Sequence, residues 1–104
     1  MKIIPDPLSF AWDKGNLDKN FKKHGVTNKE AENVFENKPI FIFADEKHST
    51  LKEKRYGAFG VTNQDRLLSV VFTVRNEYVR IITARNMSRK ERRAYEKIKN
   101  NSKL

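Results

Sequence analysis

Two stretches of alternating apolar residues near the middle of the chain are separated by only two polar residues. Leu67 to Arg75 and Tyr78 to Ala84 are rich in β-branched and aromatic side chains, which favour extended strands. A connection as short as Asn76-Glu77 joins neighbouring strands only in antiparallel orientation, because a parallel pair needs a crossover of a dozen or more residues. This hairpin constrains the fold more than any other feature of the sequence.

The chain before this hairpin begins with helical periodicity. Apolar positions at helical spacing predict a first helix over residues 14–24, with Asp13 as its N-cap and Gly25 just after its last residue. Thr27 and Glu30 form a capping-box pattern, in which each side chain bonds the main chain of the other residue. A second helix is therefore expected to follow at once.

Two further strands are expected between the helices and the hairpin, at residues 40–43 and within residues 53–62. The second of these contains Gly57 and Gly60, which in a strand mark a bulge or a close approach of another chain segment. Two helices followed by four strands and a last helix predict an α+β fold with an antiparallel sheet.

A second capping-box pattern, formed by Ser88 and Glu91, predicts the start of the last helix. Tyr95 and Ile98 lie at the spacing of an inward-facing stripe. The opposite face is mostly basic and carries Arg89, Arg92, Arg93, Glu96 and Lys97.

Alternation along the hairpin predicts which face of the sheet is buried. One face is entirely apolar and carries Leu68, Val70, Phe72 and Val74. We expect the helices to cover this face. The other face is expected to leave three polar side chains more accessible, namely Ser69, Thr73 and Arg75. Arg80 is expected to join them, because burying an unpaired guanidinium is costly. Strict alternation then puts Arg85 on the opposite face from Arg80, unless the strand ends near Ala84.

Length and composition narrow the class of protein. The 104 residues suit one small domain, which we expect to span residues 1–104. The absence of cysteine excludes a disulfide framework, thiolate catalysis and cysteine-ligated zinc. The longest charge-free apolar stretch is far shorter than the roughly 20 residues of a transmembrane helix, and the first residues lack the apolar region of a signal peptide. We therefore expect a cytoplasmic protein that does not bind a membrane.

Charge points to the kind of partner. Twenty-two lysines and arginines against 13 acidic residues give a net charge of +9. Residues 80–104 contain nine basic and two acidic side chains, so most of the excess lies in the last quarter of the chain. A polyanion is the expected partner, with nucleic acid first and an acidic protein segment second.

Seven short motifs follow one another along nearly the whole chain. They are Phe10-x-Trp12-Asp13, Asn20-x-x-Lys23-His24-Gly25-Val26, Ala31-x-x-Val34-Phe35, Asp45-x-x-His48-Ser49, Glu53-x-Arg55, Arg80-Ile81-Ile82-x-Ala84-Arg85 and Glu91-Arg92-Arg93-x-Tyr95-Glu96. In this order they resemble the BrnT toxins, the toxin half of BrnT/BrnA type II toxin-antitoxin pairs. The resemblance implies a RelE-like fold, with two N-terminal helices, a four-stranded antiparallel sheet and a C-terminal helix. It also implies a ribonuclease that inhibits translation.

The same resemblance implies the partners. RNA is the implied substrate, with ribosome-bound mRNA as one form of it. A BrnA-type antitoxin, a ribbon-helix-helix protein, is implied as the neutralising partner. Operator DNA is then expected to be contacted through the antitoxin.

The implied reaction, RNA cleavage without a metal, uses the neighbouring 2′-hydroxyl as nucleophile. Such a site needs a proton acceptor, a group that protonates the leaving 5′-oxygen, and cations that stabilise the phosphorane. Our candidates for binding the phosphate are Arg55, Arg75, Arg80 and Arg85. Glu53 is the first candidate for the proton acceptor. Arg55, two residues later and on the same face of a regular strand, would keep its carboxylate ionised.

Other side chains compete for roles in this chemistry. His24 and His48 are candidates for the acid or the base, because imidazole titrates near neutral pH. Tyr95 is a candidate for base stacking or proton transfer, by analogy with some RelE relatives. Candidates for additional RNA contacts are Lys23, Arg89, Arg92 and Arg93.

Each candidate also has a purely structural explanation. Glu53 and Arg55 suit an ordinary ion pair, and a cationic His24 would stabilise the end of a helix. His48 lies in a polar loop, where a surface histidine needs no special role. Tyr95 shares core spacing with Ile98. The arginines of the last helix suit a solvated basic face.

Metal and nucleotide chemistry have little support in the sequence. Two histidines without a ligand cluster do not form a zinc site, and the segment Gly57-Ala58-Phe59-Gly60 lacks the ending of a phosphate-binding loop. No cofactor is expected. Two alternative functions remain, a noncatalytic RNA-binding module and a module that binds an acidic protein. The ribonuclease hypothesis requires a cationic hollow beside Arg75, Arg80 and Arg85, rather than internal salt links alone.

Overall fold

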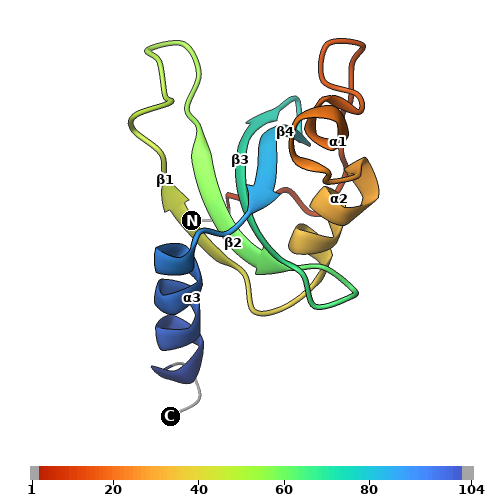
Figure 1. Ribbon diagram of the computed structural model, residues 1–104. Helices are drawn as coiled ribbons and strands as arrows, with labels where there is room; N and C mark the ends of the chain where they lie inside the picture. The colour runs from red at the N-terminus through yellow and green to blue at the C-terminus, as the bar shows by residue number, and fades with distance from the viewer. Residues whose placement is uncertain (1–2, 102–104) are drawn as a thin grey trace.

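A computed structural model describes residues 3–101 and has the predicted α+β architecture (Figure 1). The four strands form one antiparallel sheet in the order β1-β2-β3-β4. Their bounds are β1 Phe41–Ala44, β2 Tyr56–Val61, β3 Leu67–Arg75 and β4 Tyr78–Asn86. The helices are α1 Lys19–His24, α2 Asn28–Glu36 and α3 Arg89–Asn101.

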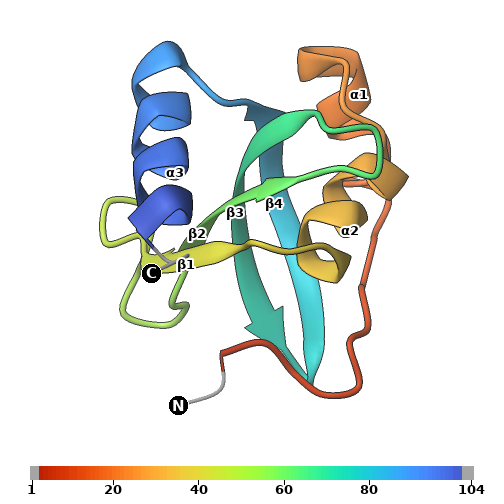
Figure 2. The same ribbon diagram turned by 90° about the horizontal axis from the view of Figure 1, so that it is seen from below.

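The sheet lies between two helical layers, with α1 and α2 on one side and α3 on the other (Figure 2). We call the side that carries Leu68, Val70 and Phe72 the core face, because these three side chains are fully buried. The other side, which carries Ser69 and Thr73, is called the outer face. Helix α2 packs on the core face, where the Phe35 ring meets the Phe72 ring edge-on at 4.9 Å.

Helix α3 lies on the outer face, so the prediction that every helix covers the core face was wrong for α3. The Tyr95 ring packs edge-on against Phe41 at 5.3 Å, and its hydroxyl donates to the Pro39 carbonyl oxygen at 2.9 Å. Phe41 and Phe59 pair across β1 and β2 and, like Leu67, are only partly buried. Apolar area on both faces needs cover, which explains why the helices are divided between them.

Ser69 and Thr73 were expected to be accessible, and both are buried, with 8% and 2% of their surface exposed. The Thr73 hydroxyl donates to the carbonyl oxygen of Lys54 at 2.8 Å, beneath the segment that joins β1 to β2. Arg75 is exposed, as predicted. The accessible part of the outer face is therefore smaller than strand alternation indicates.

Helix α1 begins at Lys19, later than predicted, because residues 14–18 form turns. Asp18, with a left-handed φ of 61°, occupies the N-cap position that was assigned to Asp13. The Asn16 main chain donates to the Asp13 carbonyl oxygen at 3.1 Å, and its side chain donates to the carbonyl oxygen of Ile81 on β4. This contact with the sheet holds the segment as turns rather than as a first helical turn.

The other predicted signals at helix ends are confirmed. Gly25 ends α1 with a left-handed φ of 68°. Thr27 and Glu30 form the first capping box, with both side-chain to main-chain distances at 3.0 Å. Ser88 and Glu91 form the second, at 2.8 and 3.2 Å.

Strand β2 begins at Tyr56, so Glu53 and Arg55 precede the strand in which they were predicted to lie. The two glycines of β2 are sites of close approach, and the register of β2 with β3 is regular. A Cβ on Gly60 would lie 2.6 Å from Val34 Cγ1, and one on Gly57 would overlap the Phe43 ring. Each glycine therefore lets a side chain rest directly on the sheet.

The hairpin is confirmed, and its two turn residues, Asn76 and Glu77, have positive φ values of 52° and 68°. Both central residues of the favoured two-residue hairpin turn have positive φ, because this geometry matches the twist of the strands.

A β-bulge interrupts the pairing of β3 with β4. Val71 pairs with Thr83, but the next residue, Phe72, pairs with Ile81, so Ile82 is an extra residue on β4. One extra residue reverses the alternation beyond it.

The bulge places Arg80 and Arg85 on the same face, which corrects the expectation from strict alternation. Arg80 pairs with Thr73 and Arg85 with Ser69, and both partners belong to the outer face. The strand also continues past Ala84, which is fully buried on the core face. The two arginines therefore share a face without the strand ending near Ala84.

Candidate functional site

A hollow of about 460 Å³ opens on the outer face, between the ends of β3 and β4 and the turns before α1. Five of its lining side chains are cationic and two are acidic, which leaves an excess of three positive charges. We call it the basic hollow. Its lining residues are Asp13, Lys14, Gly15, Asn16, Lys19, Glu53, Arg55, Arg75, Arg80 and Ile82.

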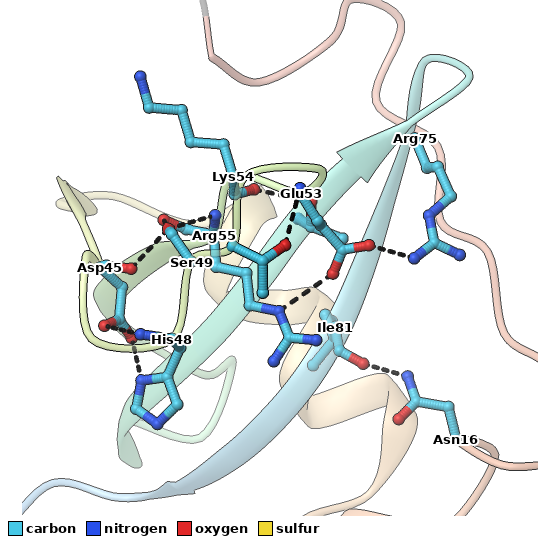
Figure 3. Close-up of polar contacts among 11 residues, drawn as sticks. Asn16, Asp45, His48, Ser49, Glu53, Lys54, Arg55, Arg75 and Ile81 are labelled. Carbon is cyan, nitrogen blue, oxygen red and sulfur yellow. Dashed lines mark hydrogen bonds and ion pairs between the residues drawn. The ribbon is translucent and has the colours of Figure 1, made fainter.

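Glu53 lies between two guanidinium groups in the basic hollow (Figure 3). One carboxylate oxygen accepts a hydrogen bond from Arg55 Nε at 3.0 Å, and the other accepts one from Arg75. These bonds, that of Arg75 foremost, hold the pKa of Glu53 below its usual range against the opposing effect of burial. The carboxylate is therefore ionised at neutral pH.

The predicted pairing of Glu53 with Arg55 exists, although both residues lie outside a regular strand. The Arg55 main chain holds the segment in place, since its N–H donates to Ser49 Oγ at 2.9 Å and its carbonyl accepts from the Asp45 N–H at 3.0 Å. Loop hydrogen bonds thus take the place of the strand register that the sequence indicated.

Arg80 projects from β4 into the same hollow and forms an ion pair with Asp13. The Arg80 side chain is 26% exposed, whereas that of Asp13 is 50% exposed. The hydrogen bond from Arg80 lowers the pKa of Asp13. Because the acid is on the solvent side, an incoming anion can compete with it for the guanidinium.

The turns before α1 supply the far wall of the hollow. Lys14 and Asn16 come from these turns, and Lys19 is the first residue of α1. The hydrogen bond from the Asn16 side chain to Ile81 holds this wall against β4 (Figure 3).

Arg85 lies outside the hollow, although it is on the same face. Its guanidinium makes two hydrogen bonds to the Glu91 carboxylate on α3, at 2.7 and 2.9 Å. These bonds lower the pKa of Glu91 to about 2. Arg85 thereby joins the end of β4 to the start of α3.

The two histidines are not among the residues that line the basic hollow. His24 is the last residue of α1. His48 lies in the loop between β1 and β2, where its Nδ1 is 2.7 Å from Asp45 Oδ2 (Figure 3).

Tyr95 also lies away from the hollow. Its ring is 1% exposed between α3 and β1, and burial raises the pKa of its hydroxyl. The remaining candidates for RNA contact are exposed on the two helices, with Lys23 on α1 and Arg89, Arg92 and Arg93 on α3.

Sequence reasoning missed part of the hollow. Lys14, Asn16 and Lys19 had been placed inside a helix, and Asp13 at its cap. The run Asp13-Lys14-Gly15-Asn16 was the available signal, because Asp, Gly and Asn favour turns. No local signal marks Ile82, which reaches the hollow through the bulge.

The requirement set from the sequence is met only in part. Arg75, Arg80 and Arg85 each pair with an acid, namely Glu53, Asp13 and Glu91. A cationic hollow nevertheless lies beside the first two, because Lys14, Lys19 and Arg55 add charge that the two acids do not balance.

These observations define a class of protein, a small α+β domain with a cationic hollow that contains an ionised carboxylate. The family model described as "Ribonuclease toxin, BrnT, of type II toxin-antitoxin system" matches residues 12–91 of the chain. The protein belongs to this family, so its class is ribonuclease toxin and its system includes an antitoxin. The matched residues include all that line the basic hollow. A comparison with curated proteins found no match.

Residues 3–101 contain neither a membrane-spanning helix nor a cluster of metal ligands. None of the helices described there has the length and apolar character needed to cross a membrane. In the same part of the chain, no three His, Asp or Glu side chains are grouped so that they could hold a metal ion.

Proposed function

We propose that the basic hollow binds a phosphate of RNA and that the protein cleaves the chain there by attack of the neighbouring 2′-hydroxyl, without a metal ion. The observation that carries this proposal is Glu53, an ionised carboxylate held between Arg55 and Arg75 in a hollow with excess positive charge. A proton acceptor and phosphate-binding cations thus lie within one site.

The proposed reaction forms one bond to phosphorus and breaks another. The 2′-oxygen attacks and its proton passes to Glu53, while the bond from phosphorus to the 5′-oxygen breaks. Lys14 or Lys19, which line the hollow, supplies the proton to the leaving oxygen. Arg80, Arg75 and Arg55 stabilise the charge of the phosphorane. The products are a 2′,3′-cyclic phosphate and a 5′-hydroxyl.

Substrate binding also strengthens the proposed base. In the free protein the pKa of Glu53 is lowered, chiefly by the bond from Arg75, which makes the carboxylate a weak base. A bound phosphate competes for Arg75 and Arg55 and brings negative charge near the carboxylate. Both effects raise the pKa of Glu53, because the ionised form loses its stabilising partners.

The proposal extends to the partners. We propose that cleavage of mRNA inhibits translation in the cytoplasm, and that a BrnA-type antitoxin neutralises the toxin and carries the contact with operator DNA. Lys23 and three arginines of α3 are proposed as additional contacts for RNA or antitoxin, namely Arg89, Arg92 and Arg93. Their exposure supports this role. His24, His48 and Tyr95 are not assigned a step, because they lie outside the basic hollow.

The decisive experiment is incubation of the purified protein with labelled RNA in EDTA, followed by analysis of the product ends. Cleavage to a 2′,3′-cyclic phosphate is expected. Glu53→Gln and Arg80→Ala should each lower the rate at least about 100-fold, in the range of single catalytic groups. Retention of RNA without cleavage would favour the noncatalytic module, and absence of both would favour a module for an acidic protein.

Matched controls separate chemistry from folding. Arg66→Ala is the control for Arg80→Ala. The Arg66 side chain pairs with Glu30 outside the hollow and is 28% exposed, close to the 26% of Arg80. Glu46→Gln changes an exposed carboxylate of the β1–β2 loop. Neither should lower the cleavage rate per folded molecule. In cells, expression of the toxin alone should arrest growth and co-expression with the antitoxin should restore it. Normal growth with abundant folded toxin would contradict the proposal.

A further inference from the structure

We infer that Phe43 is a stacking platform for an unpaired base of the RNA whose phosphate occupies the basic hollow. This inference rests on the proposed function and adds a subsite to it. The evidence is the position of Phe43 on the outer face, its exposure and its support by Gly57.

The register of the sheet arranges the outer face in parallel rows of residues. One row crosses all four strands through Phe43, Gly57, Val71 and Thr83. We call it the middle row. On one side of it, the row of Phe41 lies under α3, where Tyr95 covers it. The middle row therefore follows directly on the part of the outer face that α3 covers.

On its other side, the middle row borders the basic hollow. Arg55 and Arg80 both line the hollow, and Arg80 pairs with Thr73, two residues along β3 from Val71. Arg55 lies two residues before Gly57. Two residues along a strand span about 6.8 Å. A nucleotide whose phosphate contacts Arg55 or Arg80 can therefore place a neighbouring base over the middle row.

Phe43 is the exposed aromatic side chain of this row. One side of its ring rests on Gly57, where any Cβ would overlap it, and its edge contacts the Phe59 ring at 5.1 Å and 63°. Even so, 43% of Phe43 remains exposed. A large aromatic ring that is held on one side and open to solvent on the other is the arrangement on which single-stranded bases stack.

Apolar character continues into the hollow itself. Ile82, the extra residue of the bulge, lines the hollow together with the five cations. The hollow thus combines one apolar position with its cations, and Phe43 on β1 adds an exposed aromatic ring to the same face. An acidic peptide would share the charge but not the need for stacking, so we assign the site to RNA.

The experiment uses a 2′-O-methylated hexanucleotide, which binds but lacks the attacking hydroxyl. Its affinity is measured for the wild type, Phe43→Leu and Phe43→Trp. Loss of the ring should weaken binding about 5- to 150-fold, the range of base–aromatic stacking, and Trp should retain the affinity. Phe21→Leu is the matched control, because Phe21 is 56% exposed on α1, and no change is expected.

Abasic oligonucleotides identify the contact itself. An abasic site is placed at each position in turn, and one position should weaken wild-type binding but not the binding of Phe43→Leu. At that position 2-aminopurine fluorescence should be quenched by the wild type and by Phe43→Trp. If the losses of binding free energy from removing the base and from removing the ring add up at every position, there is no stacking contact and the inference is wrong.

The outcomes for the two proposals are distinguishable. Cleavage by the wild type with unchanged affinity of Phe43→Leu would overturn the platform and leave the ribonuclease proposal intact. Weaker hexanucleotide binding by Phe43→Leu, in a protein that cleaves no RNA, would support the platform and contradict the reaction. No binding of the hexanucleotide by the wild type would overturn the platform. If Phe43→Leu weakens the binding of an acidic peptide as much as that of the hexanucleotide, and abasic sites have no effect, the ring would be assigned to a protein partner.

Discussion

Single residues determine the features of the outer face on which the proposed RNA binding depends, namely Glu53, Phe43 and Gly57. The Glu53 carboxylate is held by two arginines, and the Phe43 ring packs against residue 57 because that residue has no side chain. The first arrangement depends on two ion pairs, and the second depends on the absence of a side chain at residue 57. Small substitutions at these positions should therefore separate binding from stability.

The two glycines of β2 give a matched test at this scale. Gly57→Ala displaces the Phe43 ring, which can swing towards solvent, so we expect a stability loss of about 1 kcal/mol. Gly60→Ala meets Val34 in the core, where the neighbour cannot leave, and should cost about 3 kcal/mol. Urea unfolding measures both. RNA affinity should fall only for Gly57→Ala, and an equal stability loss in the two variants would contradict this account.

At the scale of elements, two features determine which side chains of β4 reach the hollow and how α3 is attached to the sheet. The bulge at Ile82 determines which residues of β4 face the hollow, and the pair of Arg85 with Glu91 joins β4 to the capping box of α3. Neither feature is a property of one strand or helix alone. Each can be removed by a single change.

Deletion of Ile82 should remove the bulge and restore strict alternation. Ile81 and Thr83 already pair with the adjacent residues Phe72 and Val71, so every other side chain of β4 keeps its face when Ile82 is removed. We therefore expect a stability loss of no more than about 1 kcal/mol. Deletion of Val71 on β3 is the contrasting variant, because it puts the buried Val70 and Phe72 on opposite faces, and should cost more than about 3 kcal/mol. Thermal unfolding followed by circular dichroism distinguishes the two.

The charge of Glu91 should make the attachment of α3 dependent on pH. Its pKa is about 2 in the folded protein against an ordinary value of 4.5, so protonation favours the unfolded state. The stabilisation is complete above pH 4.5 and is lost as the pH falls towards about 2. Glu91→Gln keeps a capping acceptor and should cost about 1 kcal/mol at pH 7. This difference should vanish at low pH, whereas Glu96→Gln should show none at either pH.

At the scale of the whole molecule, charge and apolar area are divided between the two faces of the sheet. The core face is covered by α1 and α2, and the outer face is covered only partly by α3 (Figure 2). The hollow collects cations from four separate parts of the chain. Of the basic side chains in residues 80–104, only Arg80 is among the residues that line the hollow, so the charge of that segment identified only part of this cationic surface.

Salt dependence should report the excess charge of the hollow. If its three excess charges each neutralise one phosphate of a single strand, the logarithm of the binding constant should fall with the logarithm of salt concentration with a slope of about −2. Arg80→Ala should reduce the size of this slope by about 0.7. Phe43→Leu should weaken binding at every salt concentration without changing the slope. A slope near zero for the wild type would exclude phosphate binding in the hollow.

The sequence alone determined the elements of this protein, because their signals are local. Two capping boxes, the glycine after α1 and the two-residue turn act within a few neighbouring residues, and all appear in the structure. The apolar alternation of β3 likewise identified the core face, since burial of one set of side chains dominates the free energy of folding.

Only the tertiary structure decided which side chains and helices lie on each face of the sheet. Ile82 is extra because β4 must match the register of β3, and residues 14–18 avoid a helix because Asn16 bonds to Ile81 on β4. Helix α3 crosses to the outer face because Phe41 there needs cover. These outcomes depend on contacts between residues far apart in the chain, which local pattern cannot encode.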